Sequence, residues 1–525
     1  MTTDDLFRSR LDSMIDTRHP LAVLATRMPW SEIEAALAPV LAHKDRAGRH
    51  VEDTDLFGPT SQAVAAGVSN AGRPRSPVRL MVSLLYLKHA FNESDESLVE
   101  RWSENVYWQF FSGMTHFEPR LPCDATQIGR FRRVLGEAGV EQLLQTTIEA
   151  SVTMGAVKKS EFERIIVDTT VQEKAIAHPV DSRLLEIARH KVVSAAKRAG
   201  LVLKQTFAKE GKQLRRKAGG YAHAKQFNRL RRTVKRQRTI LGVVMRDARR
   251  KLEQLHQGVA AHEPTALAVW ALQTWLERAE RIRTQQRHSK NKLYALHAPE
   301  VECISKGKAR KPYEFGVKVS LAITHKQGLM VGARSFPGNP YDGHTLAEQL
   351  EQTNTLLEGI GVKPTAAIVD LGFRAVDDEV APVQLIHRGK IKTLDQQQRR
   401  WLKRRQAIEP AIGHTKSDHR MDRCWLQGSL GDALHAVLCA AGYNIRWLLR
   451  AIVRKGLGAL LLALIMLARH ARSTIGSSAK HSSGFKHVKR PAAYPDKHRE
   501  MNFAGRRWRL RASSHAAPTC VRVEI

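Results

Sequence analysis

The sequence is poor in cysteine, and the spacing of its cysteines excludes two common roles. The 525 residues contain five, widely separated and without a CxxC pair: Cys123, Cys303, Cys424, Cys439 and Cys520. This pattern indicates neither a disulfide framework nor a zinc finger. It fits a protein that works in a reducing cytoplasm.

Long apolar runs are also missing. The most membrane-like stretch, GLGALLLALIMLA between Lys455 and Arg469, has about 13 residues, whereas a spanning helix needs ~20. We therefore expect a buried helix there and no membrane partner. The first residues, MTTDDLFRSR, have no apolar core behind a basic start, so they do not predict a secretory signal.

Acidic residues are scarce relative to basic ones. The chain has 85 Lys and Arg against 51 Asp and Glu, a formal net charge of +34. This excess is larger than solubility requires and indicates a polyanionic partner, nucleic acid before a membrane surface. At 42% hydrophobic residues, the chain can still bury an ordinary core.

Helical patterns dominate from Pro77 to about Val157. The segment RLMVSLLYLKHAF has apolar residues at helical spacing, and Ser94 opens a second helix. A third helix is expected to start at the cap Asp124 and to meet a glycine stop soon after its arginines. Between about 181 and 290 the pattern predicts long basic helices in which acids are nearly absent.

Strand patterns flank those basic helices. FERIIVDTTVQ predicts a strand ending at Asp168 and Thr169, and further strands are expected in YEFGVKVSLAI, GLMVGARSF, TAAIVDLGF and PVQLIH. A helix is expected in HTLAEQLEQTNTLLEGIG. Strands on both sides of a helical excursion predict one α/β domain that carries an insertion.

The expected domain organisation follows from these patterns. A partly helical segment spans 1–70, a helical DNA-binding domain 71–157 and the α/β domain 158–470, with its helical insertion at about 181–290. From about Arg472 the chain is rich in Ser, His, Lys, Arg and Pro without periodicity. We expect a basic, disordered tail over 471–525.

Three acids are candidates for chemistry. Asp168 and Asp370 each follow an apolar strand-like run, where a carboxylate is held rigidly at a sheet edge. Either one alone is as well explained as a strand end or a helix cap. Glu409 precedes Pro410, which indicates a helix start or a kink, and taken alone it is a solvated acid neutralised by arginines.

Taken together, the three acids fit a two-metal site for phosphoryl transfer. Such a site uses hard cations held by carboxylates to activate a water or hydroxyl and to stabilise the leaving oxygen. The basic surroundings would then bind the phosphates of the substrate.

Several longer blocks resemble a known family. IIVDTTVQEKAIAHP, HAPEVECISKGKARKPYEFGVKVS, FPGNPYDGHTL and RRQAIEPAIGHTKSDHRMDR occur in the order found in the DDE transposases of bacterial insertion sequences, in the insertion-sequence-five family. The resemblance covers about residues 30 to 465. It implies an RNase H-like catalytic domain preceded by an all-α DNA-binding domain, and Mg²⁺ catalysis, with Mn²⁺ as the alternative ion and two ions in the site.

The resemblance also assigns roles around the third acid. The implied catalytic and metal-binding triad is Asp168, Asp370 and Glu409. The family's extended motif is Tyr, two residues, Arg, three residues, Glu, six residues, Lys, and here Arg405, Glu409 and Lys416 fit it. Leu402 stands at the tyrosine position, so no tyrosine hydroxyl acts there. Arg405 and Lys416 become DNA-phosphate contacts, although each alone is equally well explained as a solvated charge.

Other basic residues are candidates for DNA binding. In the third helix they are Arg130, Arg132 and Arg133, placed to read bases in a major groove, unless the helix packs inward through Phe131, Val134 and Leu135. In the basic helices they are Arg231, Arg232, Lys235 and Arg236, which we expect to bind phosphates. Arg73 and Arg75 resemble a minor-groove arm, with a plain linker as the default.

Two remaining acid and histidine groups have plainer interpretations. His414 and His419 match no ligand spacing, and we interpret them as surface or DNA-facing residues. Asp342, in the turn FPGNPYDGH, is expected to cap a helix rather than to ligate a metal.

The leading hypothesis is a cytoplasmic, nucleoid-associated transposase. It binds the inverted ends of its element as a homo-oligomer, cleaves DNA and joins the 3′-OH to target DNA. Two alternatives remain: a catalytically inactive remnant that represses transposition, and a helical RNA-binding protein whose acids are structural. The irregular tail raises the first alternative, whereas the three acids favour catalysis.

Overall fold

The computed structural model describes residues 9–41, 76–256, 266–286, 288–305, 311–373, 376–377, 380 and 382–478, without the side chains of 256 and 457–478. The chain divides into two compact units, 1–458 and 459–525, and the architecture below is that of the first. The proposed arm with Arg73 and Arg75 and the tail beyond 478 lie outside the described residues.

The N-terminal part is helical, as predicted. Its helices are α1 (Leu11–Met14), α2 (Pro20–Arg27), α3 (Trp30–Leu41), α4 (Val78–Ala90), α5 (Asp95–Glu104), α6 (Val106–Phe111) and α7 (Ala125–Thr153). The two expected caps are present. Ser94 forms a capping box with Ser97, and the Asp124 carboxylate accepts a hydrogen bond from the Thr126 backbone N–H at 2.8 Å.

A kink replaces the expected glycine stop in the third predicted helix. Gly136 has φ 62° and ψ −167°, which interrupts the helical backbone, and the helix then resumes and runs to Thr153. Glycine adopts this left-handed φ without the steric cost that a Cβ brings. The arginine-bearing part of α7 is therefore a separate segment ahead of the kink.

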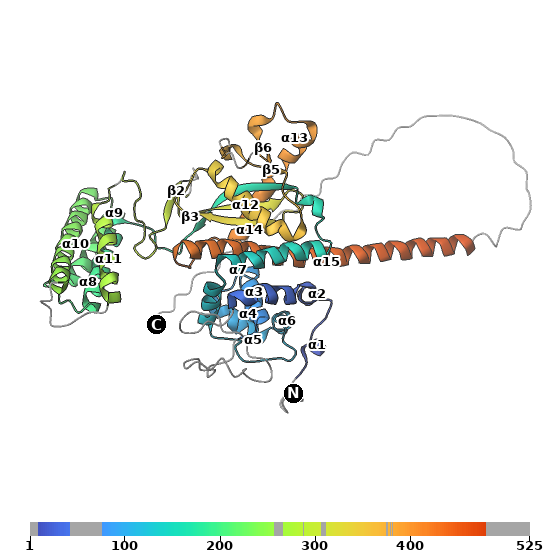
Figure 1. Ribbon diagram of the computed structural model, residues 1–525, viewed down its shortest axis with the longest axis horizontal. Helices are drawn as coiled ribbons and strands as arrows, with labels where there is room; N and C mark the ends of the chain where they lie inside the picture. Colours follow the sequence, from blue (N-terminus) through green and yellow to red (C-terminus); the bar gives the residue numbers. More distant parts are fainter. Residues whose placement is uncertain are drawn as a thin grey trace, which may run out of the picture. The chain divides into compact units, whose positions relative to one another are not determined.

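One mixed sheet of six strands forms the centre of the fold (Figure 1). The strands are β1 (Arg164–Glu173), β2 (Glu302–Ser305), β3 (Tyr313–Thr324), β4 (Met330–Phe336), β5 (Ala366–Ile368) and β6 (Gln384–Ile386). The order is β2-β3-β1-β5-β6, and β4 also pairs with β3. The pairs of β3 with β1, β2 and β4 are antiparallel, whereas β1–β5 and β5–β6 are parallel.

Helices cover this sheet and connect it to the N-terminal part. α12 (Leu346–Leu357) packs on β3 and β4, and α14 (Ile408–Asp418) packs on β1. The remaining elements here are α13 (Gln396–Lys403) and the 3-10 helices η2 (Lys159–Glu161), η3 (Asp342–Thr345), η4 (Glu358–Ile360), η5 (Leu371–Phe373), η7 (Arg388–Lys390) and η8 (Arg405–Ala407). The buried core is continuous from the N-terminal helices through the sheet to α15 (Gly428–Ser478).

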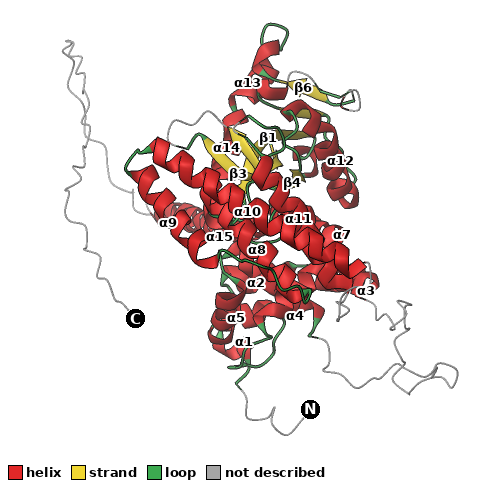
Figure 2. Ribbon diagram, turned by 90° about the vertical axis from the view of Figure 1, so that its left-hand side faces the viewer, coloured by secondary structure: helices red, strands yellow, loops and turns green. Residues whose placement is uncertain are grey.

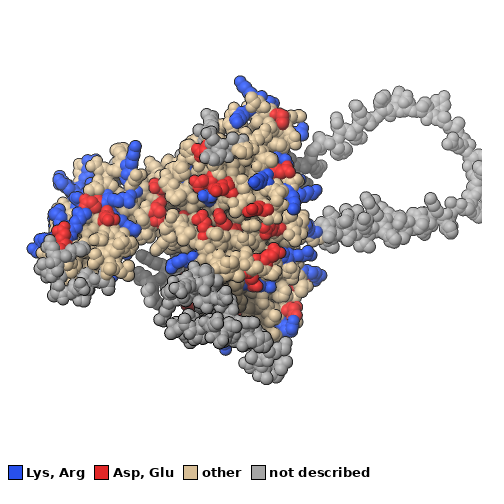
Figure 3. Space-filling model, viewed as in Figure 1, with Lys and Arg blue, Asp and Glu red and all other residues tan. Residues whose placement is uncertain are grey.

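Four helices between β1 and β2 have a core of their own. They are α8 (Asp181–Arg198), α9 (Ala208–His223), α10 (Phe227–His256) and α11 (Ala266–Thr284). Leucines, alanines and other apolar residues on their facing sides form a separate cluster that includes Leu185, Leu241 and Leu272. The helices lie side by side as a bundle (Figure 1 and Figure 2). Lys and Arg side chains are distributed over the visible surface of this bundle, with acidic side chains among them (Figure 3).

A buried ion-pair network fastens the end of β1 to α15. Lys174 Nζ lies 2.8 Å from Glu300 Oε1 and 2.8 Å from Asp432 Oδ1, and the Lys174 and Asp432 side chains are almost fully buried. Burial alone would lower the pKa of Lys174, but the attraction of Asp432 and Glu300 outweighs it and leaves that pKa raised. The network adds ion pairs to the apolar contacts that hold the sheet against α15.

α15 corrects one sequence-based expectation. Its backbone is helical through the apolar run and on to Ser478, so the irregular tail does not begin at 471. The part Gly428–Gly456 is long and apolar enough to cross a membrane, but 72% of its most apolar window is buried inside the protein, as in a core helix. The side chains of the run GLGALLLALIMLA lie outside the described residues.

Candidate active site

Asp168 and Asp370 both lie just beyond the paired part of two neighbouring strands. β1 pairs with β5 in the parallel register Arg164↔Ala366 and Ile166↔Ile368, where the pairing ends. Asp168 lies two residues further along β1, and Asp370 follows the last residue of β5 by two positions. The two acids are 202 positions apart in the sequence, yet both follow the same end of the β1–β5 pairing.

The prediction that β1 ends at Asp168 is wrong. β1 continues to Glu173, and its later residues pair with β3 from Ser320 to Gly316. The polar residues beyond Asp168 are buried within the fold, so the sequence pattern alone resembles a strand end. Gln172, for example, donates a hydrogen bond to the Asp432 carbonyl at 3.0 Å. Asp168 is thus held in mid-strand, where its backbone is fixed on both sides.

Glu409 is connected to Asp168 by the Arg405 side chain. η8 leads directly into α14, and Glu409 lies in the first turn of α14 ahead of Pro410, so of the two alternatives, a helix start or a kink, the structure has the helix start. Arg405 Nη1 lies 3.4 Å from Asp168 Oδ2, and Arg405 Nη2 lies 3.2 Å from Glu409 Oε1. One guanidinium therefore links the first and third acids, with Glu409 the more exposed of the two.

A fourth carboxylate, Asp342, lies at the site, although the sequence pattern did not place it there. Its Oδ1 accepts hydrogen bonds from Thr169 Oγ1 at 3.0 Å and from Lys318 Nζ at 2.8 Å. The expectation that Asp342 acts as a helix cap is not met, because its carboxylate binds these two side chains. The signal available in the sequence was Lys318, a lysine inside an apolar strand that needs a buried acid as its partner.

Gly372 separates Asp342 from Asp370. Asp370 Oδ1 accepts a hydrogen bond from the Gly372 backbone N–H at 2.7 Å. A Cβ on Gly372 would lie 2.9 Å from Asp370 Oδ1 and 3.0 Å from Asp342 Oδ2. Both carboxylates therefore approach the backbone at this glycine closely, and a side chain there would displace them.

The donor set fits a hard divalent cation. Carboxylate oxygens are the ligands that Mg²⁺ and Mn²⁺ prefer. The carboxylate oxygens of the three acids do not all lie within 4.8 Å of one another. Among the described residues, only His89, His435 and Cys439 form a group of three whose ligand atoms lie that close together. Instead, the Arg405 guanidinium stands between Asp168 and Glu409, so this region already holds a positive charge between two carboxylates.

The three arginines of α7 separate into two groups. Arg130 and Arg133 are exposed. Arg132 is 3% exposed and its Nη2 lies 2.9 Å from Asp95 Oδ1, so it is an internal ion-pair partner and the prediction that it contacts DNA is not retained. Of the residues that the alternative expected to pack inward, Leu135 is buried, whereas Val134 is 55% exposed.

The cations of the basic helices lie on a grooved surface. Arg231 and Lys235 line a cavity of about 920 Å³ together with Arg183, Arg215 and Arg238. Arg232 is exposed, and Arg236 forms an ion pair with Glu210 at 2.7 Å. Four of the five cavity cations come from α9 and α10, so the bundle concentrates positive charge around one concavity.

The other residues named from the sequence have ordinary surroundings. Leu402, at the family's tyrosine position, is 8% exposed and packs in the core. Lys416 is half-buried on α14. His414 is bound to Asp418 at 2.8 Å on the surface. His419 is buried and its Nδ1 donates to the carbonyl oxygen of His89 at 2.8 Å, so the surface interpretation is wrong for His419.

Comparison with known proteins identifies the family. Residues 45–134 match the family model described as Transposase domain (DUF772), and residues 274–445 match the one described as Transposase DDE domain. A relative from Rhizobium meliloti, "Uncharacterized protein ORF8 in nfe locus", is 41% identical over 224 residues, which are 95% of that protein and 43% of this chain. The chain belongs to the DDE transposases of insertion sequences.

The transposase assignment agrees with the fold. A DDE domain implies an RNase H-like α/β fold, and the chain combines its mixed sheet with an N-terminal helical region. DDE transposases use divalent metal ions. The matched DDE segment contains Asp370 and Glu409, whereas Asp168 precedes it. No solved structure matches the chain.

Proposed function

We propose that this transposase binds the inverted ends of its insertion sequence, cleaves a phosphodiester bond at each end and joins the freed 3′-OH to target DNA. The observation that supports this proposal is that Arg405 binds both Asp168 and Glu409, while Asp370 follows β5, the parallel neighbour of the strand that carries Asp168. We place this activity in the bacterial cytoplasm, with the protein on nucleoid DNA as a homo-oligomer.

Asp168, Asp370 and Glu409 would hold the divalent ions in this mechanism. Two Mg²⁺ ions, with Mn²⁺ as the substitute, supply charge that activates the attacking water or 3′-OH and stabilises the leaving oxygen. The position of Asp168 within β1, and that of Asp370 two residues after β5, would hold two ligands in place before DNA arrives. Glu409, on α14 and 59% exposed, can adjust to complete the site.

Arg405 has a second task in the same mechanism. Its guanidinium pairs with both Asp168 and Glu409. With these acids engaged by cations, the Arg405 N–H groups would be available for a phosphate oxygen of the substrate, which a planar guanidinium binds well. Lys416, seven residues after Glu409 on the same helix, would contact a neighbouring phosphate.

Asp342 and Lys318 would keep the site in shape. Lys318 Nζ donates to both the Pro340 carbonyl, at 2.5 Å, and Asp342 Oδ1, so it ties the η3 turn to β3. Thr169, next to Asp168 in β1, donates to the same carboxylate. Asp342 therefore positions the strand that carries Asp168, and it presents its second oxygen toward Gly372 and Asp370.

The helical bundle would be a DNA-binding insertion of the RNase H-like domain. Phosphate contacts carry no base information, and a groove lined by Arg183, Arg215, Arg231, Lys235 and Arg238 suits a DNA backbone. Arg232 would add a contact from the exposed face of α10, while Arg236 is already paired with Glu210. Base readout would fall to Arg130 and Arg133, the exposed arginines ahead of the Gly136 kink.

Nicking of a DNA duplex that carries the inverted ends of the element tests the proposal. The ends are found by sequencing the DNA that flanks the gene. Purified protein should nick this duplex in the presence of Mg²⁺ and leave it intact with a chelator. Tight, end-specific binding without nicking in Mg²⁺ or Mn²⁺ would identify an inactive remnant that acts as a repressor. Binding of RNA in preference to the ends would overturn the transposase proposal.

A further inference from the structure

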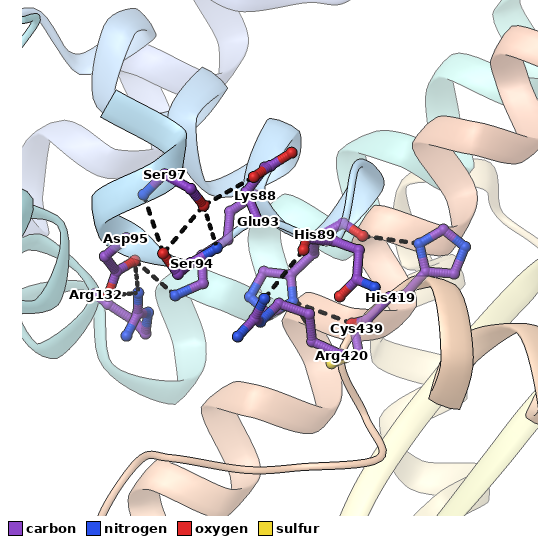
Figure 4. Close-up of polar contacts among 11 residues, drawn as sticks. Lys88, His89, Glu93, Ser94, Asp95, Ser97, Arg132, His419, Arg420 and Cys439 are labelled. Carbon is purple, nitrogen blue, oxygen red and sulfur yellow. Dashed lines mark hydrogen bonds and ion pairs between the residues drawn. The ribbon is translucent and has the colours of Figure 1, made fainter. Parts of the chain in front are cut away.

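A second group of possible metal ligands consists of histidine and cysteine side chains rather than carboxylates. It consists of His89 on α4 and of His435 and Cys439 on α15. One ligand atom from each of them lies within 4.8 Å of the other two. All three side chains are buried, with exposures of 1%, 5% and 0%. Figure 4 shows His89 and Cys439 facing each other, and His89 Nδ1 lies 3.5 Å from Cys439 Sγ.

Helix geometry explains why these three residues meet. His435 and Cys439 are four residues apart, so they share one face of α15. Opposite them, α4 approaches α15 very closely at Gly442, where a Cβ would lie only 2.5 Å from His89 Cβ and 2.6 Å from the His89 carbonyl carbon. The absence of a side chain at Gly442 therefore brings His89 onto the face that carries the other two groups.

Hydrogen bonding of His435 leaves a nitrogen for a ligand. Its Nε2 lies 2.8 Å from the Arg420 carbonyl oxygen, which can only accept a hydrogen bond, so Nε2 carries the proton. Nδ1 of the neutral ring then keeps its lone pair. A ligating histidine whose other ring nitrogen donates to a backbone carbonyl is the usual arrangement at protein metal sites.

A cavity beside the group provides access and room for a further ligand. It has a volume of about 400 Å³ and is lined by His89 and His435 together with Lys88, Arg132 and Trp425. Of the three cations that line the cavity, Lys88 and Arg132 share the carboxylate of Asp95, at 2.6 Å from Lys88 Nζ and 2.9 Å from Arg132 Nη2, as Figure 4 shows, and the third is Arg420. The repulsion that Lys88 and Arg132 exert on a bound cation is thereby reduced.

We propose that His89, His435 and Cys439 bind a Zn²⁺ ion that joins α4 to α15. Two imidazoles and one thiolate form a donor set that suits zinc, whereas Mg²⁺ and Mn²⁺ prefer oxygen. The fourth position of the tetrahedron is filled by a water molecule or an anion from the adjacent cavity. Zinc binding releases the Cys439 thiol proton to solvent, and the thiolate then balances one charge of the ion.

This site is separate from the proposed catalytic metals and connects two parts of the fold. α4 belongs to the N-terminal helices, and α15 packs against the sheet, with Asn444 Oδ1 accepting a hydrogen bond from the Met330 backbone N–H at 2.9 Å. A zinc ion between α4 and α15 would therefore fix the N-terminal helices relative to the catalytic sheet. It would stabilise the folded chain by an amount that grows with the logarithm of the free zinc concentration above the dissociation constant.

Metal analysis of the full-length, untagged protein tests the site. Protein purified with added zinc and then dialysed should retain about one zinc per chain, as one three-residue site implies. Cys439→Ser and His435→Asn should each lower zinc affinity by more than the ~10-fold that loss of an outer hydrogen-bond partner costs. Cys123→Ser, which removes a buried cysteine elsewhere, should retain zinc. Asp370→Asn should retain it too, which separates this site from the catalytic proposal.

Cobalt substitution gives a readout that does not depend on variants that fold. Co²⁺ bound to the wild-type protein should show a thiolate-to-cobalt charge-transfer band and the intense visible bands of a tetrahedral ion. The charge-transfer band should be absent in Cys439→Ser. Folded wild-type protein that retains no zinc and shows no thiolate band with Co²⁺ would overturn the proposal, as would zinc retention by the Cys439→Ser variant.

Discussion

Arg405 Nη1 lies 3.4 Å from Asp168 Oδ2, although 237 positions separate the two residues in the sequence. The same guanidinium also binds Glu409, so it occupies the space between two acids that would hold metal ions. Arg405 is therefore both a competitor of the ions and a candidate phosphate ligand.

Replacement of Arg405 by glutamine should separate these two effects. Removal of a charge-assisted hydrogen bond to the phosphate, worth about 1.5–3 kcal/mol, should slow cleavage roughly 10- to 100-fold at saturating Mg²⁺. The Mg²⁺ concentration for half-maximal cleavage should fall, because the competing cation is gone. Cleavage rates measured over a Mg²⁺ titration check both effects. An Arg404→Gln variant is the matched control, because the Arg404 guanidinium donates to the carbonyls of His325 and Lys326 instead; equal effects of the two changes would contradict the role of Arg405.

Replacement of Gly372 by alanine should damage the site without unfolding the protein. The new methyl group would lie 2.9 Å from Asp370 Oδ1 and 3.0 Å from Asp342 Oδ2, so one or both carboxylates must move. A shift of this kind at the reacting centre can cost about 100-fold in rate. Gly413→Ala on α14 is the control, because a Cβ there has no neighbour within 4 Å and should raise stability by about 1 kcal/mol at most. Normal cleavage by Gly372→Ala would show that Asp370 or Asp342 does not take part in the active site.

Replacement of Lys174 by methionine should strongly destabilise the fold. Lys174 neutralises Glu300 and Asp432, and its removal leaves two carboxylates buried without a cation. Breaking a buried pair in this way costs about 3–5 kcal/mol. The free energy of unfolding from urea titration measures it. Lys311→Met removes a surface partner of Glu173 and should change stability by less than about 1 kcal/mol. A small effect of Lys174→Met would show that the network does not hold β1 to α15.

Neutralising the groove of the helical bundle should weaken DNA binding at low salt. If Arg215, Arg231 and Lys235 each bind a phosphate, each of them displaces counterions from the DNA. The triple glutamine variant should therefore flatten the slope of log affinity against log salt by about 0.9 for each phosphate that is no longer neutralised. Fluorescence anisotropy with the element ends and with random duplex should give the same change. Arg236→Gln serves as the control because Glu210 already pairs with Arg236. An unchanged slope in the triple variant would show that these three residues are solvated surface charges that do not bind phosphates.

Particular residues show how far the sequence could predict this fold. Ile165, Ile166 and Val167 predict β1 because an apolar β-branched run has few alternatives, and Ser94 and Asp124 predict helix starts because their side chains satisfy free backbone N–H groups. The continuation of β1 beyond Asp168 was not predictable. Its polar residues are buried by partners from distant segments, such as Asp432 at Gln172, and local pattern does not contain them.

The candidate site was also predictable only in part. The resemblance to the family indicates Asp168, Asp370 and Glu409, whereas the residues that contact them are seen only in the structure. The turn that holds Asp342 suggests a helix cap, whereas the actual partners of Asp342 come from β1 and β3. The sequence pattern makes Arg132 a surface arginine in a basic helix, yet Asp95, 37 positions earlier, draws it into the interior. Long-range ion pairs of this kind leave no periodic trace in a sequence.

Strand cleavage by variants of the three acids tests the shared metal site most directly. Asp168→Asn, Asp370→Asn and Glu409→Gln should each abolish Mg²⁺-dependent nicking of the element ends while leaving end binding within about twofold, since each change alters one metal ligand and almost no volume. Asp418→Asn, an exposed acid on the same helix as Glu409, should nick at the wild-type rate. Wild-type nicking by any one of the three variants, with folding and end binding intact, would contradict the shared metal site.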